Sequence, residues 1–296
     1  MEINEVENLL INTQYEQFIG NIQKVELKKN IYSDLFKMGN DKIGYFSIKI
    51  RKNTEKQVID TINCLSEIND QENFINKIIN HFEKDNYIIM ISEWLKGIQP
   101  IDNNRDLLPL FYEKLAYLNK QNIVKGPYTS MYADGKYFDT TSDLIDWEIN
   151  YHKQYIKSIV EIDELLKYLN NLKHGISCII LEDVNTGNLF LTESGKYKYI
   201  DTEFIMRGLN LYQFEKMDYF CFEGKEWYNI TDEAKECYKA YFNMLRTKDD
   251  EANEQIRAYE LLSVLRKNTY LKYLKKDDDN EIVRRLKIII ETNKFI

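Results

Sequence analysis

The chain has 296 residues, a formal net charge of −8, and 44% apolar and 13% aromatic residues. This length allows one large core or two moderate cores, and the composition excludes a disordered protein. No basic cluster stands out, so we expect no nucleic acid and no anionic membrane as a partner.

The N-terminus is acidic and lacks the basic segment and apolar stretch of a secretion signal, and no run of 18 apolar residues occurs. We therefore expect a soluble cytoplasmic protein, either a monomer or a homodimer. The cysteines are far apart and form no Cys-x-x-Cys motif, which favours free or buried thiols over disulfides or a zinc site. They are Cys64, Cys178, Cys221 and Cys237.

Residues 1–96 predict a lobe built on a small antiparallel sheet. A leading helix or arm over 4–20 precedes three alternating strands, one helix and two further strands. These elements are expected at 22–27, 31–36, 45–50, 54–68, 74–82 and 87–93. The run Lys96-Gly97-Ile98-Gln99-Pro100 interrupts the pattern and predicts a lobe boundary.

Residues 97–296 predict a mostly helical second lobe. Helices are expected at 104–120, 141–158, 161–172, 231–246, 251–275 and 279–292, and two or three short strands over 178–201 interrupt them. The predicted fold class is therefore α+β, with two lobes.

The segment 177–203 contains the residues best suited to chemistry. The apolar run 177–181 predicts a strand that ends just before Asp183, and a turn at 193–196 predicts a hairpin that returns Asp201 to the same edge. Asn188 follows Asp183 by five residues. Carboxylate and amide oxygens at this spacing are typical of kinase-type sites, where they orient a hydroxyl and hold Mg²⁺ against nucleotide phosphates. The alternative is a polar turn without chemistry.

In this order of motifs the chain resembles the aminoglycoside phosphotransferase and choline kinase superfamily, whose fold is protein-kinase-like. The family's loop usually reads His-Gly-Asp-(x)4-Asn, where this chain has Leu181-Glu182-Asp183 and then Asn188. The resemblance implies that Asp183 is the catalytic residue and that Asn188 and Asp201 bind the metal. It covers about residues 20–225.

The resemblance also implies a nucleotide site in the first lobe. Lys49, in the third predicted strand, matches the lysine that contacts the α- and β-phosphates. The segment 89–97 resembles the hinge, where backbone groups near Glu93 and Trp94 would meet the adenine edge. The implied enzyme is Mg²⁺-dependent and transfers the γ-phosphoryl group of ATP or GTP to a hydroxyl of an aminoglycoside, a choline-like amine or a sugar.

The chain departs from the family pattern at three points. Leu181 replaces the usual histidine, no glycine occurs between Gly20 and Gly39, and no single acid stands out as the partner of Lys49. The candidates for that acid are Glu55, Asp60 and Glu67. These departures motivate an alternative function, a catalytically inactive kinase-like module for binding or assembly. A protein kinase is disfavoured because the Ala-Pro-Glu and Asp-Phe-Gly motifs are absent.

Two further clusters lie near residues 139–155. An acidic stretch leads the predicted helix, where acids favour the N-terminal dipole, and it is also suited to a cationic substrate. It comprises Asp139, Asp143, Asp146 and Glu148. Trp147, Tyr151 and Tyr155 recur at helical spacing, for which core packing is the expectation and a cage for an ammonium group the alternative.

Overall fold

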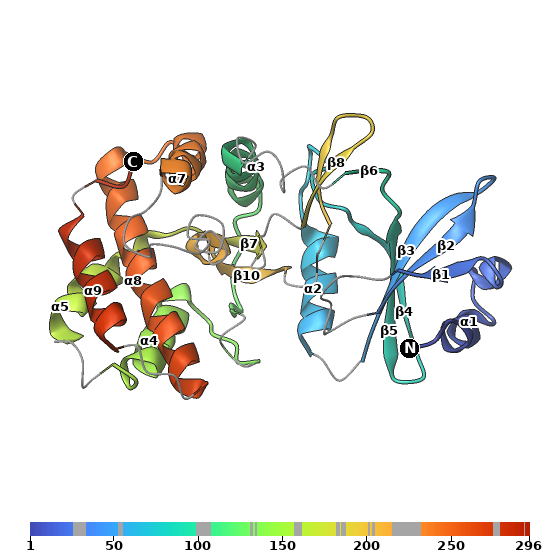
Figure 1. Cartoon of the computed structure of the whole chain (residues 1–296), viewed down its shortest axis with the longest axis horizontal. Helices are drawn as coiled ribbons and strands as arrows, with labels where there is room; N and C mark the ends of the chain where they lie inside the picture. Colours follow the sequence, from blue (N-terminus) through green and yellow to red (C-terminus); the bar gives the residue numbers. More distant parts are fainter. Residues whose placement is uncertain are drawn as a thin grey trace. The chain divides into compact units, whose positions relative to one another are not determined.

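Figure 1 shows a computed structural model of the chain. It describes residues 1–25, 34–52, 56–98, 108–130, 133, 135–156, 162–181, 184, 188–200, 202, 205–214, 232–274, 279–292 and 294–296. The chain forms two compact units. The first comprises residues 1–67, 72–98 and 190–204, and the second comprises 68–71, 99–189 and 205–296. The assignment of nucleotide binding to residues 1–96 stays a prediction.

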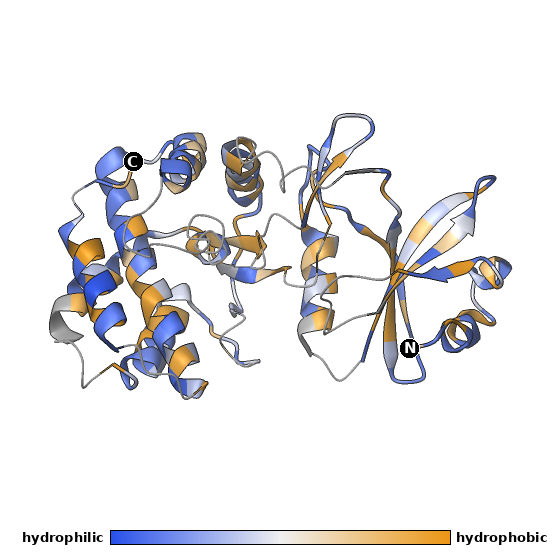
Figure 2. Cartoon of the chain, in the orientation of Figure 1, coloured by the Kyte–Doolittle hydropathy of each residue, from blue (hydrophilic) through white to orange (hydrophobic). Residues whose placement is uncertain are grey.

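The first unit contains a five-stranded antiparallel sheet in the order β1-β2-β3-β5-β4. The strands are β1 (Ile22–Lys24), β2 (Asp34–Asn40), β3 (Gly44–Lys52), β4 (Ile78–Lys84) and β5 (Tyr87–Glu93). Helix α2 (Lys56–Glu67) lies between β3 and β4 in the chain. It carries both hydrophobic and hydrophilic residues (Figure 2), as an amphipathic helix does. The predicted order of three strands, a helix and two strands is confirmed.

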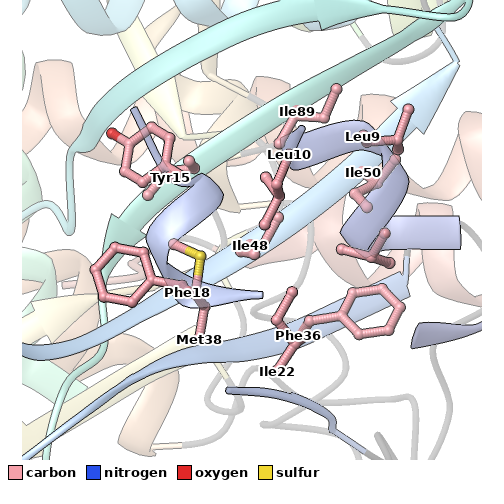
Figure 3. Packing of buried hydrophobic residues seen from close by; sticks show 12 residues of the cluster. Leu9, Leu10, Tyr15, Phe18, Ile22, Phe36, Met38, Ile48, Ile50 and Ile89 are labelled. Atoms are coloured by element: carbon pink, nitrogen blue, oxygen red, sulfur yellow. The ribbon is translucent and has the colours of Figure 1, made fainter. Parts of the chain in front are cut away.

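The N-terminal arm covers one face of this sheet. The arm consists of α1 (Ile3–Leu10) and the 3₁₀ turn η1 (Glu16–Phe18). Leu10, Phe18 and other apolar side chains of the arm pack onto alternate residues of β2, β3 and β5 (Figure 3). On the opposite face, Val58 of α2 packs against Ile88 and Met90 of β5. Because side chains of a strand alternate between faces, this burial fixes which residues of β3 face α2.

A second, three-stranded sheet of the first unit has the order β6-β8-β9. Its strands are β6 (Gly97–Ile98), β8 (Leu189–Thr192) and β9 (Tyr197–Tyr199). Gly97 permits a close approach of two backbones, because a Cβ atom there would lie 2.1 Å from the Leu191 carbonyl oxygen. The glycine that marks the predicted lobe boundary therefore has a structural reason.

The second unit is mostly helical. Its helices are α3 (Leu108–Gln121), α4 (Thr141–Lys153), α5 (Ile162–Leu169), α7 (Asp232–Leu245), α8 (Asp249–Tyr273) and α9 (Asp279–Glu291), with 3₁₀ turns η3 (Asn170–His174) and η6 (Asn210–Phe214). Strands β7 (Ser177–Leu181) and β10 (Ile205–Leu209) pair antiparallel. The predicted helices and the α+β class are confirmed. Within the described residues, no helix has both the length and the apolar character needed to cross a membrane.

The predicted hairpin around the turn at 193–196 is confirmed as β8 and β9, but two further pairings were not predicted. Strand β7 pairs with β10, and β8 pairs with β6. Strand β10 was missed because its residues are almost all buried and show no apolar–polar alternation. Among the described residues, Cys64, Cys178 and Cys237 are buried and form no disulfide, as expected, and Cys221 lies outside the described residues.

Candidate functional site

Lys49 lies on the face of the sheet that α2 covers. It is paired with Leu35 of β2 and Met90 of β5, and it is partly exposed. Its strand neighbours Ile48 and Ile50 are buried on the opposite face, under the N-terminal arm. Of the three acids proposed as partners of Lys49, Asp60 and Glu67 lie on α2 and Glu55 lies outside the described residues.

Glu93 and Trp94 line a cavity of about 730 Å³ that lies within the first unit. The β2–β3 turn, the segment after β5 and the β8–β9 hairpin form its walls, and Tyr45, Thr192 and Lys198 are among the lining residues. Lys49 does not line this cavity. The cavity therefore brings the two predicted adenine-binding residues together with a hairpin that the sequence did not place beside them.

Internal hydrogen bonds already use much of the backbone at this segment. The Glu93 carbonyl accepts a bond from the Asn76 side-chain amide at 3.2 Å, and the Trp94 N–H donates to the Tyr45 carbonyl at 3.1 Å. The Lys96 carbonyl accepts from the Glu193 N–H at 3.0 Å. Across the described residues, no such bond engages the Trp94 carbonyl or the Leu95 N–H. The predicted contact with an adenine edge would therefore fall on these two groups.

A cation lies against the aromatic rings beside this cavity. The Lys37 ammonium is 3.9 Å from the centre of the Tyr45 ring and 5.3 Å from that of Trp94. Lys37 pairs with Ser47, two residues from Lys49, so Lys37, Tyr45 and Lys49 share one face of the sheet. Sequence reasoning missed Lys37 and Tyr45; the alternation of β2 and β3 was the signal that could have indicated them.

The predicted catalytic segment follows β7. Leu181 ends this strand, is fully buried and pairs with Ile205 of β10. Asp183 comes two residues after Leu181, and Asp201 comes four residues before Ile205; both acids lie outside the described residues. Asn188 is 9% exposed and directly precedes β8.

The acidic stretch around α4 does not form one cluster. The Thr140 hydroxyl caps α4 by accepting a bond from the Asp143 N–H at 3.1 Å, and Asp146 pairs with Lys173 at 2.8 Å. Glu148 is buried and receives two bonds from Arg266, at 2.8 and 2.6 Å. Capping and ion pairing thus account for these acids, while Asp139 is exposed.

Trp147 and Tyr151 of α4 and Tyr155, just after this helix, form an aromatic ladder. Tyr151 is exposed and the other two rings are partly exposed, so the expected burial in the core is not met. The Trp147 and Tyr151 rings stack with centroids 5.3 Å apart, and Tyr155 meets Tyr151 edge-on at 5.8 Å. Tyr151 is 37% exposed. The Lys136 ammonium already lies 4.8 Å from the centre of the Trp147 ring, so a cation of the chain itself faces this ladder.

No protein-family model and no curated protein matches the chain in sequence. Solved structures do match it in fold. A putative fructosamine-3-kinase from Haemophilus somnus 129PT aligns over 98% of this chain and 96% of its own, with a TM-score of 0.56 and 17% identity. Aminoglycoside phosphotransferase APH(4)-Ia aligns over 99% of both chains, with a TM-score of 0.59 and 14% identity.

A Plasmodium vivax ethanolamine kinase covers 96% of this chain and 84% of its own, with a TM-score of 0.56 and 13% identity. A thermostable APH(4)-Ia mutant, solved as a ternary complex with AMP-PNP and hygromycin B, covers 98% of both chains at a TM-score of 0.59 and 16% identity. At such identities these likenesses establish the fold.

Proposed function

The chain has the protein-kinase-like fold of the aminoglycoside phosphotransferase and choline kinase superfamily, and we propose that it is a small-molecule kinase. It would transfer the γ-phosphoryl group of ATP or GTP to a substrate hydroxyl. The observation that carries the proposal is the sheet order β1-β2-β3-β5-β4 with Lys49 on the face covered by α2. Lys49 thereby lies on the same face of the sheet as Lys37 and Tyr45, which belong to the Lys37–Tyr45–Trp94 cluster.

The proposed nucleotide lies along β3. Tyr45 and Lys49 are four residues apart on one face of this strand, which corresponds to about 13 Å at the rise of an extended chain. This span suits a base at the Trp94 carbonyl and Leu95 N–H and phosphates at the Lys49 ammonium. The cavity beside Trp94 supports the position of the base.

Mg²⁺ fits the proposed donor set. The carboxylates of Asp183 and Asp201 and the amide oxygen of Asn188 are hard oxygen ligands, and Mg²⁺ usually takes one or two protein ligands together with phosphate oxygens. When bound, the ion neutralises phosphate charge. In the proposal Asn188 and Asp201 hold it.

Asp183 orients the acceptor hydroxyl and receives its proton, and Lys49 steadies the α- and β-phosphates. The rate then comes from positioning and charge stabilisation and needs no covalent intermediate on the protein.

A panel of acceptors tests the proposal. The purified protein is incubated with Mg·ATP or Mg·GTP and hygromycin B, choline, ethanolamine or a ketoamine sugar, and phosphorylated product is detected by mass spectrometry. We expect Mg²⁺-dependent phosphorylation of one acceptor class. Absence of transfer to every acceptor, together with absence of Mg·ATP binding in calorimetry, would contradict the proposal.

Leu181 supports one alternative, a kinase-like module that no longer transfers phosphate. Its side chain is fully buried in the β7–β10 pair, so the position of the family's histidine belongs to the apolar core. The same calorimetry separates the two functions. An active kinase is expected to bind ATP with an affinity that depends on Mg²⁺. A module that no longer transfers phosphate is expected to show no such Mg²⁺-dependent binding.

A further inference from the structure

A network of hydrogen-bonded polar side chains lies in the core of the second unit. Asn119 of α3, Asn210 and Gln213 of η6 and Tyr241 of α7 are all completely buried. Figure 1 shows α3 and α7 beside one another, next to the β7–β10 pair. Buried polar groups are costly unless they are hydrogen-bonded, so such a set fixes one geometry of the elements that carry it.

The Tyr241 hydroxyl is the centre of this network. It donates to the Asn119 side-chain oxygen at 2.6 Å and accepts bonds from the side-chain amides of Asn210 at 3.0 Å and Gln213 at 3.1 Å. The Gln213 amide also donates to the Asn119 oxygen. Burial raises the pKa of Tyr241 well above its ordinary value, so the hydroxyl keeps its proton.

The network holds the backbone of β7 and of the residue before it. The Asn119 side-chain amide donates to the Ile179 carbonyl at 2.9 Å, while Asn210 accepts from the Ile176 N–H through its side chain at 2.8 Å and donates its own N–H to the Ile176 carbonyl at 2.9 Å. Ile176 immediately precedes β7, and Ile179 is its central residue. These bonds add to the backbone pairing with β10.

We propose that Tyr241 and Asn119 position β7 and thereby the segment that carries Asp183. This inference rests on the proposed function for its catalytic consequence. Without the Tyr241 hydroxyl, three buried amides lose a partner, and the Asn119 side-chain oxygen loses one of the two donors that orient its amide toward Ile179. Since misplacement of a catalytic group by about 1 Å can cost about 100-fold in rate, a small movement of β7 is enough to slow transfer.

The chain offers a matched control on the same helix. Tyr238 of α7 is also fully buried, and its hydroxyl donates to Glu260 of α8. Tyr241→Phe and Tyr238→Phe therefore remove the same atom from the same helix in equally buried surroundings. The Tyr238 hydroxyl bonds to α8, whereas the Tyr241 hydroxyl is connected through Asn119 to the Ile179 carbonyl of β7.

The experiment measures kcat and KM for Mg·ATP in both variants, each at the same interval below its own Tm. Tyr241→Phe is expected to lower kcat about 10- to 100-fold with KM for Mg·ATP within about 2-fold, and Tyr238→Phe to leave kcat within about 3-fold. If Tyr241→Phe does not fold, Gln213→Met, which removes one donor to Tyr241, is expected to lower kcat in the same way but less. The proposal is overturned if the Tyr241→Phe or Gln213→Met variant that folds keeps the kcat of wild type. It is also overturned if Tyr238→Phe loses as much kcat as Tyr241→Phe.

Hydrogen exchange of peptides that cover Ile176–Leu181 separates this inference from the proposed function. Tyr241→Phe should speed exchange there, and Tyr238→Phe should not. If the wild-type protein transfers no phosphate, the proposed function fails, and the exchange data alone decide the positioning of β7. Equal exchange in wild type and Tyr241→Phe contradicts it.

Discussion

At the scale of single residues, substitution of Lys49 tests whether this side chain binds phosphate or has only a structural role. It is partly exposed on the α2 side of β3, whereas Lys52, at the end of the same strand, is exposed. Both are lysines of one strand, but Lys52 is an odd number of residues away and faces the other side of the sheet.

We therefore predict that Lys49→Ala lowers kcat/KM for Mg·ATP about 100-fold, because a charge-assisted contact to phosphate is lost. Lys52→Ala should stay within about 2-fold of wild type. Steady-state kinetics of ADP release measures both. Equal effects of the two substitutions would mean that Lys49 has no phosphate contact.

His152 links stability to pH. Burial, reinforced by the charge of Arg266, lowers the pKa of His152 to about 3. Glu148 lies 3.9 Å from the ring, but its charge is already neutralised by Arg266 at 2.6 Å and does not offset the effect of burial. The folded protein thus holds a neutral imidazole, whose Nδ1 lies 2.8 Å from the Thr269 hydroxyl.

A depressed pKa in the folded state means that the unfolded chain binds the proton first. The stability contributed by neutral His152 is complete above the unfolded pKa of about 6.5 and is lost as pH falls toward 3. Between pH 6 and pH 4 we expect wild type to lose up to about 1.4 kcal/mol per pH unit more than His152→Gln. Urea unfolding at several pH values measures the two slopes, and parallel slopes would contradict the account.

At the scale of elements, the N-terminal arm is part of the core of the first unit. Leu10 of α1 is fully buried in the cluster that the arm forms with the sheet (Figure 3). Ile3 of the same helix is 37% exposed. The arm therefore completes one face of the sheet that carries Lys49 on its other face.

Leu10→Ala is expected to reduce the free energy of unfolding by about 3 kcal/mol, because it removes buried methyl groups and leaves a cavity. Ile3→Ala should cost less than about 1 kcal/mol, since part of that side chain is already in water. Chemical denaturation compares the two. A Leu10→Ala cost as small as that of Ile3→Ala would show that the arm is not a part of the core.

The elements that the sequence predicted well are those with a clear period. Val58 and Ile62 recur along α2, and Ile48 and Ile50 alternate along β3, so type and place follow from hydrophobic spacing. Strand β10 has no such alternation because both of its faces are buried, and its pairing with β7 depends on residues far apart in the chain. A single sequence carries no local signal for such a pairing.

At the scale of the whole molecule, the order of motifs along the chain predicted the fold. The pairing of β7 with β10 and the exposure of the Trp147–Tyr155 ladder became known only from the three-dimensional structure. The kinase-like resemblance is confirmed in fold by solved structures that align over nearly the entire chain. Burial of the Trp147–Tyr155 ladder was predicted wrongly, because helical spacing alone does not say which face of α4 meets the core. The roles of Asp183, Asn188 and Asp201 stay predictions.

The central claim is that Asp183 enables phosphoryl transfer, and comparison of Asp183→Ala with Glu182→Gln tests it most directly. The control removes the charge of the adjacent residue, which has no role in the proposed mechanism. With Mg·ATP and the acceptor found in the panel, we predict that Asp183→Ala lowers kcat by about 100-fold or more while Mg·ATP still binds in calorimetry. Glu182→Gln should retain kcat within a few-fold. Full phosphoryl transfer by Asp183→Ala would contradict the proposed function.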